Sequence, residues 1–312
     1  MLSIARTLES IRPHFSGHET FPLRQLWLLK YTQYLQDLHR QGLDKHLDTE
    51  EAIIALGVGK NMVNSMRFWA EAAGMVKPDA LELTPLGGAI FNDDKPKGLD
   101  LDCEHTATQW LVHWNLSSTP DTFTGNWIIF NLVNGPVSDR EMLLKHFKNF
   151  CKENNFKTSD STLKRCIEVC LRSYLPRQSG KGHMEDFIEP FLGDLDLLRP
   201  ASKEGFDFHL AYHASLPDGI FAYALVDYWN RLSSTSSTLD FNRIAHGFGS
   251  PGRVFKLDPK SVDLRLSHLE PLTDGALVWT EQAGLRQVIR RDDALRDTQA
   301  FMLRMLRQAY SE

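Results

Sequence analysis

A chain of 312 residues is about twice the length of an average domain of ~150 residues, and it can bury a core without disulfides or metals. Its composition, 42% hydrophobic and 24% charged, is typical of a globular protein and excludes a wholly disordered one. No apolar run approaches the ~20 residues that span a bilayer, and the first residues lack the apolar region of a signal peptide. We therefore expect a cytoplasmic protein with no membrane partner, whose four cysteines are buried thiols.

Charge is distributed unevenly along the chain. In total, 35 Lys and Arg against 40 Asp and Glu give a net charge of −5, which excludes a simple polycation that coats nucleic acid. Residues 140–181 carry ten basic and four acidic side chains, whereas residues 183–220 carry two basic and eight acidic ones. This asymmetry fits one face that meets a polyanion, and it fits equally a pair of solvated helix faces.

The first predicted helix follows Pro22, where apolar residues recur at helical spacing up to Leu38. A turn at 95–98 marks a candidate domain boundary, and the next thirty residues are rich in aromatic side chains. Residues 139–175 are typical of two basic amphipathic helices split near Asn154. From Phe187 onward helices alternate with short strands, up to a last helix over about 293–309.

Residues 49–91 carry the clearest local pattern. A helix that begins at Thr49 meets the turn Gly57–Gly59, and a second helix follows with Met62, Met66, Trp69 and Ala73 on one face. A short strand at LELT and the segment PLGGAIF come next, which together predict a winged helix-turn-helix. The outward side of the second helix has the residue types that contact bases and phosphates, or alternatively a protein partner. These residues are Lys60, Asn61, Asn64 and Arg67.

The segment FSGHETFPLR offers two interpretations. His18, Glu19 and Arg24 could act on a phosphodiester, with His18 as proton acceptor, Glu19 as metal ligand or orienting group, and Arg24 as phosphate contact. Alternatively, Thr20 caps a helix that starts at Pro22, and the same three residues form a buried polar network. One His and one carboxylate are too few for a complete metal site.

Several of these blocks together resemble one bacterial family. FSGHETFPLR with Trp27, LGVGKNMVNSMRFWAE at 56–71, LTPLG at 83–87 and ATQWLVHWNL at 107–116 are similar to hallmarks of the SspB family, found beside DNA phosphorothioation genes. The resemblance implies a component of the Ssp defence system, in which a cysteine desulfurase, an ATPase and a phosphosulfate-reductase-like enzyme place sulfur on the DNA backbone. It further implies DNA nicking, with a divalent cation such as Mg²⁺ or Mn²⁺, and supplies no catalytic residues.

No motif in the chain supports nuclease chemistry by itself. Pro217-Asp218 and Asp258-Pro259-Lys260 match the restriction-type pattern by letter, but a helix is expected between them and Pro259 would interrupt a strand. The acids from Asp93 to Glu104 are expected to be a solvated loop, and Cys166 and Cys170 are expected to pack in the core. The turn Gly57–Lys60 lacks the remaining residues of a phosphate-binding loop. Neither nucleotide nor zinc is therefore expected as a cofactor.

Two further regions are predicted to contact DNA. Helix residues Lys164, Arg165 and Arg172 face outward from the basic region and would contact phosphates. Near the C-terminus, ALVWT and LRQVIRR are predicted to be two strands of a second wing. The cations of that wing are Arg286, Arg290 and Arg291.

We therefore predict a mainly α protein with a minor β part, built from winged helix-turn-helix modules joined by a helical middle region. The predicted divisions are an N-terminal winged-helix domain over 1–98, a helical middle with a basic face over 99–185, and a C-terminal winged-helix-like domain over 186–312. The predicted function is double-stranded DNA binding with nicking in phosphorothioation-based defence, with the Ssp ATPase and reductase-like enzyme as partners. The alternatives are a non-catalytic DNA-binding adaptor and a transcriptional regulator.

Overall fold

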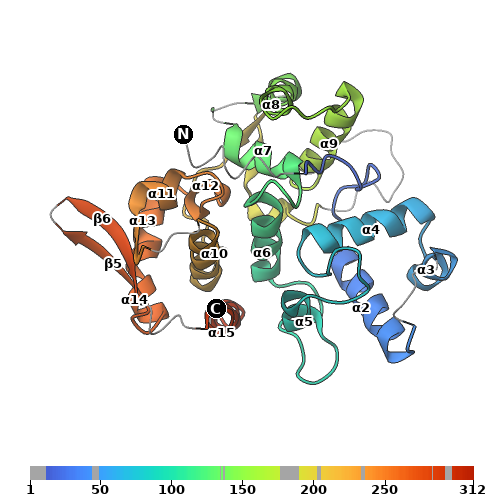
Figure 1. Cartoon of the computed structure of the whole chain (residues 1–312), viewed down its shortest axis with the longest axis horizontal. Coiled ribbons are helices and arrows are strands. Elements are labelled where there is room, and N and C mark those ends of the chain that lie inside the picture. The colour runs from blue at the N-terminus through green and yellow to red at the C-terminus, as the bar shows by residue number, and fades with distance from the viewer. Residues whose placement is uncertain are drawn as a thin grey trace. The chain divides into compact units, whose positions relative to one another are not determined.

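The computed structural model describes residues 12–43, 49–133, 135, 138–175, 190–201, 205–232, 236–282, 284–291 and 297–312 (Figure 1). Contacts between residues divide the chain into two compact units, one up to Phe208 and one from His209 onward. The boundaries that composition suggested near residues 98 and 185 both fall inside the first unit. None of the described helices is long and apolar enough to cross a membrane.

The first unit begins with three helices that pack on one another. Both α2 (Trp27–Arg40) and α3 (Thr49–Leu56) contact α4 (Lys60–Ala72). Gly57, with φ 66°, lies in the tight turn between α3 and α4, where a residue without Cβ adopts a left-handed backbone at little cost. Met66 and Trp69 on α4 are fully buried, which confirms the apolar stripe expected on this helix.

The expected start of the first helix is wrong by several residues. α2 begins at Trp27, because Leu26 has φ 64° and is left-handed, and such a residue cannot continue a right-handed helix. Thr20 has φ 73° and is exposed, so it does not cap a helix at Pro22. The chain from residue 14 to residue 24 therefore runs as an irregular segment beside the helices.

A helix follows α4 where a strand and wing were expected. Val76 and Leu83 form one isolated antiparallel bridge, and α5 (Pro85–Phe91) comes directly after it. The Thr84 hydroxyl accepts the backbone N–H of Gly87 at 2.9 Å and so caps α5. The strand predicted at LELT is thus reduced to a single bridge, and PLGGAIF is helical.

The same unit contains a second helical group with a small sheet. α6 (Thr106–Ser117) packs on α7 (Thr124–Leu132), and α7 packs on both α8 (Arg140–Glu153) and α9 (Asp160–Arg172). The side chains of Asp139 and Ser159 cap α8 and α9, which confirms the two helices expected over 139–175. The antiparallel sheet has the order β1-β3-β2. Its strands are β1 (Ser138–Asp139), β2 (Leu198–Pro200) and β3 (Gly205–Phe208), and the 3-10 turn η2 (Gly193–Leu195) directly precedes β2.

The second unit has a similar order of elements. It starts with α10 (Asp218–Arg231) and β4 (Thr238–Asp240), and β4-β6-β5 is the strand order of its antiparallel sheet. Between β4 and β5 lie four short helices, α11 (Phe241–His246), α12 (Pro251–Val254), α13 (Pro259–Ser267) and α14 (Leu269–Leu272). β5 (Leu277–Gln282) pairs along its whole length with β6 (Leu285–Arg290), which confirms the two strands predicted there. The final helix, α15 (Thr298–Ala309), packs on α10.

The interior agrees with the fold class expected from the sequence. The protein is mainly α with small antiparallel sheets. Its largest fully buried side chains include Trp69, Trp110, Trp114 and Trp229. All four cysteines are buried and unbridged, as predicted. Burial strongly raises the pKa of the Cys170 thiol, which therefore remains protonated and unreactive at neutral pH.

Candidate nucleic-acid interface

The outward side of α4 is exposed where the sequence placed its polar residues. Lys60, Asn61 and Asn64 are exposed near the beginning of the helix. Arg67 is half-buried and already paired, with its Nε 2.8 Å from Glu71 Oε1 and its Nη2 3.3 Å from Asp79 Oδ1. The hydrogen bond to Glu71 is the main reason that the pKa of Arg67 is raised. The first three residues are thus available for contact, whereas Arg67 would have to leave its carboxylates.

The α8–α9 pair presents a second cationic surface. Lys164 and Arg165 are exposed on α9, and Arg172 lies half-buried near its end. A groove of about 720 Å³ runs between the helices, with Leu144 and Ile167 among its lining residues. The cations that line it are Arg140, Lys145, Lys148 and Lys164.

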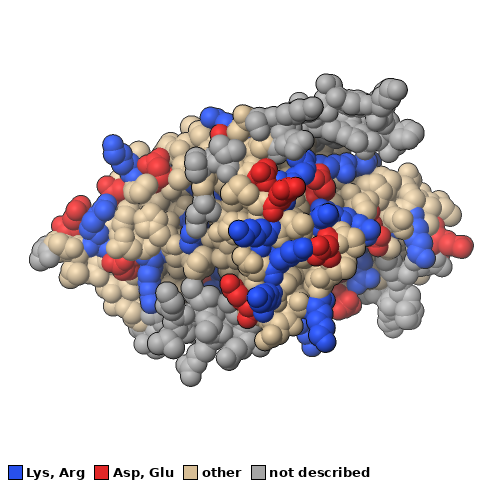
Figure 2. Space-filling view, turned by 90° about the horizontal axis from the view of Figure 1, so that it is seen from above, with Lys and Arg blue, Asp and Glu red and all other residues tan. Residues whose placement is uncertain are grey.

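Ion pairs occupy part of this cationic surface. Lys148 Nζ lies 2.6 Å from Asp160 Oδ2, and the Arg140 guanidinium pairs with Glu168. Figure 2 looks onto the end of the protein that carries α8, where Lys and Arg side chains stand close together with acidic side chains between them. The arrangement suits contact with a polyanion, because groups of cations remain exposed at pH 7.

The three residues assigned to possible chemistry do not converge on one another. His18 is 1% exposed, and its ring packs edge-on against Phe68 and Phe123. Burial lowers the pKa of His18 to about 4, so the ring is neutral at pH 7. Glu19 is exposed, and the Arg24 guanidinium lies over the rings of Phe21 and Trp27.

Residues 14–24 make structural contacts with helices on both sides of the segment. The Ser65 hydroxyl donates to the His18 carbonyl at 3.0 Å, and the Trp69 indole N–H donates to the Phe21 carbonyl at 3.1 Å. On its other side, the Leu23 N–H donates to the Ser173 hydroxyl at 3.3 Å. A catalytic role for His18 stays a prediction that would require the ring to become accessible.

The arginines of the C-terminal hairpin brace the second unit. The Arg286 guanidinium lies 3.9 Å from the centre of the Phe241 ring and donates to Asp263 on α13 at 2.8 Å. Arg290 lies over the Trp229 ring at 5.2 Å. Arg291, directly after β6, is exposed. Of the three cations predicted on this wing, Arg291 is exposed, whereas Arg286 and Arg290 are half-buried.

The structure reveals a partly buried ionic cluster, centred on Arg265, that the sequence did not suggest. Asp218, the first residue of α10, accepts from Arg265 Nη1 at 2.6 Å and lies 2.6 Å from His268 Nδ1. The side chain of Arg265 is fully buried, and it also donates to the carbonyls of Tyr212 and His213. The bonded pairs lie between 47 and 53 positions apart and form no motif, so only the tertiary contacts could show them. Because Asp218 starts a helix and Asp258 caps α13, the restriction-type pattern is not formed.

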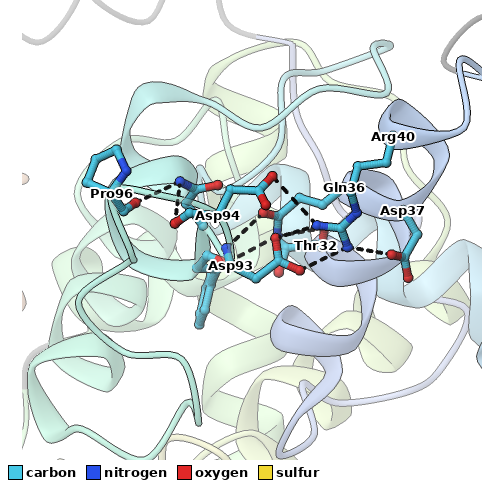
Figure 3. A network of polar contacts seen from close by, with 9 residues as sticks. Thr32, Gln36, Asp37, Arg40, Asp93, Asp94 and Pro96 are labelled. Atoms are coloured by element: carbon cyan, nitrogen blue, oxygen red, sulfur yellow. Dashed lines mark hydrogen bonds and ion pairs between the residues drawn. The ribbon is translucent and has the colours of Figure 1, made fainter.

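The acidic loop after α5 is held by internal contacts. Arg40 on α2 donates to Asp93 at 2.8 Å and lies 3.7 Å from Asp94 (Figure 3). Asp100 is buried and accepts the backbone N–H of Glu104 at 3.1 Å. Within the described ranges, no group of three or more His, Cys, Asp or Glu side chains is placed to hold a metal ion.

Fold and surface together define a mainly α-helical protein whose first unit carries a group of exposed cations on two paired helices, α8 and α9. The family described as "Protein of unknown function (DUF4007)" matches residues 15–310, and the chain belongs to that family. No curated protein matches the chain.

Two solved structures share the fold. A magnesium-bound SspB crystal structure is 24% identical with a TM-score of 0.78, covering 96% of this chain and 91% of that one. Another SspB crystal structure is 22% identical with a TM-score of 0.79, covering 98% of this chain and 92% of that one. The resemblance to SspB noted in the sequence is thus confirmed at the level of the fold.

Proposed function

We propose that this protein is a DNA-binding component of an Ssp-type DNA phosphorothioation defence system. The observation that carries the proposal is the likeness to SspB over nearly the whole length of both chains. Double-stranded DNA would be its ligand, and the Ssp ATPase and phosphosulfate-reductase-like enzyme its protein partners. The exposed cations of α4 and α9 supply surfaces that suit a phosphate backbone.

The order of elements supports a winged-helix interpretation of both sheets. In each unit a helix is followed by one strand, then by at least two helices, and then by two more strands. The last of these strands lies in the middle of the three-stranded sheet. In the winged-helix arrangement, the helix before the final two strands enters the major groove. Among the described helices, that role would fall to α9 in the first unit and, because α14 has only four residues, to α13 in the second. α4 would have it in a third module reduced to one strand bridge.

Two activities are compatible with such a component. The first is nicking of one DNA strand to assist sulfur incorporation, with Mg²⁺ or Mn²⁺ held partly by substrate phosphates, as is common for Mg²⁺. The second is a non-catalytic adaptor that brings the sulfur-transfer enzymes to their DNA site. Burial of His18 in its neutral form favours the adaptor, because the ring of the candidate catalytic group is not accessible from the surface.

A plasmid assay separates these activities. Supercoiled plasmid is incubated with the purified protein in Mg²⁺, in Mn²⁺ and in EDTA, while binding to linear duplex is measured in parallel. Conversion to the open-circular form in either metal but not in EDTA would establish nicking. Binding without conversion would establish the adaptor, and the absence of both would contradict the proposed function.

A further inference from the structure

We propose that Phe15–Phe21, termed the clasp below, joins α4 and α9 into one composite surface for double-stranded DNA, with Gly17 and His18 as positioning residues. This inference rests on the proposed DNA binding and adds to it how the two cationic helices are held. The clasp is the segment that first suggested catalysis. Its contacts indicate that its role is to fix the distance and the angle between α4 and α9.

On one side, the clasp is fastened to α4. Ser65 holds the carbonyl of His18, and Trp69 holds the carbonyl of Phe21. The His18 ring lies 5.8 Å from the Phe68 ring, centre to centre. Ser65 and Phe68 follow the exposed Asn61 and Asn64 by one turn on the same side of the helix, so the clasp contacts α4 directly beside its exposed first turn.

On the other side, the clasp is fastened to the helices around α9. His14, next to the clasp, exchanges two hydrogen bonds with Thr124 at the start of α7, at 2.8 Å and 3.2 Å. The Phe15 ring packs 5.9 Å from Phe147 on α8, and Leu23 is tied to Ser173 at the end of α9. Arg165 on α9 lies close enough for its charge to help lower the pKa of His18.

The backbone of the clasp has little freedom to move. Gly17 has φ 106°, a conformation that residues with a side chain rarely adopt. A Cβ at this position would lie 2.6 Å from Cδ2 of Phe68, so Phe68 and the α4 backbone that carries it would have to shift. Among the described elements, α4 makes no extensive direct contact with α8 or α9. Their relative placement therefore depends on the clasp, on Phe123, whose ring also meets Phe68 and Trp69, and on Asn115 of α6, whose amide donates to the Ala73 carbonyl at the end of α4.

A fixed spacing between two weak contact surfaces increases affinity for a ligand that spans both. The second contact becomes intramolecular, and its effective concentration is highest when the connection matches the span. Double-stranded DNA is such a ligand because it repeats its grooves every ~10 base pairs. The exposed Ser16, Gly17, Glu19 and Thr20 lie on the clasp surface between the two helices.

The test compares long and short duplexes. We measure the Kd of the full-length protein by fluorescence anisotropy for a duplex of about 24 base pairs and for one of about 8, too short to reach both helices at a repeat of ~10 base pairs. For Gly17→Ala we expect the affinity for the long duplex to fall about tenfold and that for the short duplex to change less than about twofold. Equal losses on both duplexes, or none on either, would overturn the inference.

Two further variants keep the test decisive. Gly42→Ala is the matched control, because Gly42 also has a positive φ, 69°, but a Cβ there would meet nothing within 4 Å. It should preserve the ratio of the two affinities even if its Tm falls. Ser65→Ala removes one clasp hydrogen bond with less strain and should lower the same ratio about threefold, which covers the case that Gly17→Ala does not fold. If the wild-type protein binds neither duplex, the proposed function itself is wrong, whereas binding with unchanged ratios contradicts only the clasp.

Discussion

Protonation of His18 should destabilise the folded protein in acid. The ring is buried against Phe68 and Phe123, and its Nε2 has no hydrogen-bond partner among the described residues. Burial lowers its pKa from 6.5 to about 4, so the unfolded chain takes up a proton before the folded one does. The stability due to the neutral ring is therefore complete above about pH 6.5 and is lost as the pH falls towards about 4.

The size of this effect follows from the two pKa values. At about 1.4 kcal/mol per pKa unit, the interval between 6.5 and about 4 corresponds to a loss of about 3 kcal/mol near pH 4. About 2 kcal/mol of that should already be lost at about pH 5. For a chain of this length, the loss at about pH 5 would lower Tm by several degrees.

Urea unfolding at about pH 7 and about pH 5 measures this loss, with His18→Gln as the comparison because glutamine does not titrate. The difference in stability between the two pH values should be about 2 kcal/mol smaller in His18→Gln than in the wild type. His246→Gln is the matched control for the substitution itself, since His246 is exposed in the second unit. Identical pH dependence in His18→Gln and the wild type would refute the assignment of a buried, neutral His18.

Further expectations concern DNA binding and the hairpin. Reversing Lys164 and Arg165 to Glu should weaken binding to all DNA sequences and reduce the slope of log K against log salt by about one unit for each phosphate that is no longer neutralised. Lys30→Glu, at an exposed position on α2, should leave the affinity and the slope unchanged. An unchanged slope in the α9 variant would remove α9 from the interface. Asn64→Ala should cost about 1–3 kcal/mol in specific binding if the amide pairs with a base, and gel shifts equal to wild type would exclude that pairing. Arg286→Ala should lower the unfolding free energy by about 1–2 kcal/mol, because it removes the stacking on Phe241 and the pair with Asp263. Its DNA affinity should stay within about twofold of wild type. Unchanged stability by calorimetry together with weaker binding in gel shifts would contradict this prediction.

Local features of the fold followed from the sequence alone. Helical spacing of apolar residues, capping residues such as Ser159, and turn glycines such as Gly57 act within a few positions, so α4, α8, α9 and the β5–β6 hairpin were predicted close to their observed bounds. The resemblance to SspB was also present in short blocks of sequence, and the shared fold confirms it. The exposure of Lys60, Asn64 and Lys164 followed directly from helical periodicity.

The tertiary structure decided the features that depend on distant partners. Whether His18 was accessible depended on Phe68 and Phe123, which lie 50 and more positions away in the chain. Whether Arg286 was an exposed cation or a paired one depended likewise on Asp263, a carboxylate brought near by folding. Helical spacing fixes which face a residue occupies, but desolvation and ion pairing depend on what packs against that face. For that reason the sequence predicted which helix residues are exposed, while only the packing showed that FSGHETF contacts both α4 and α8.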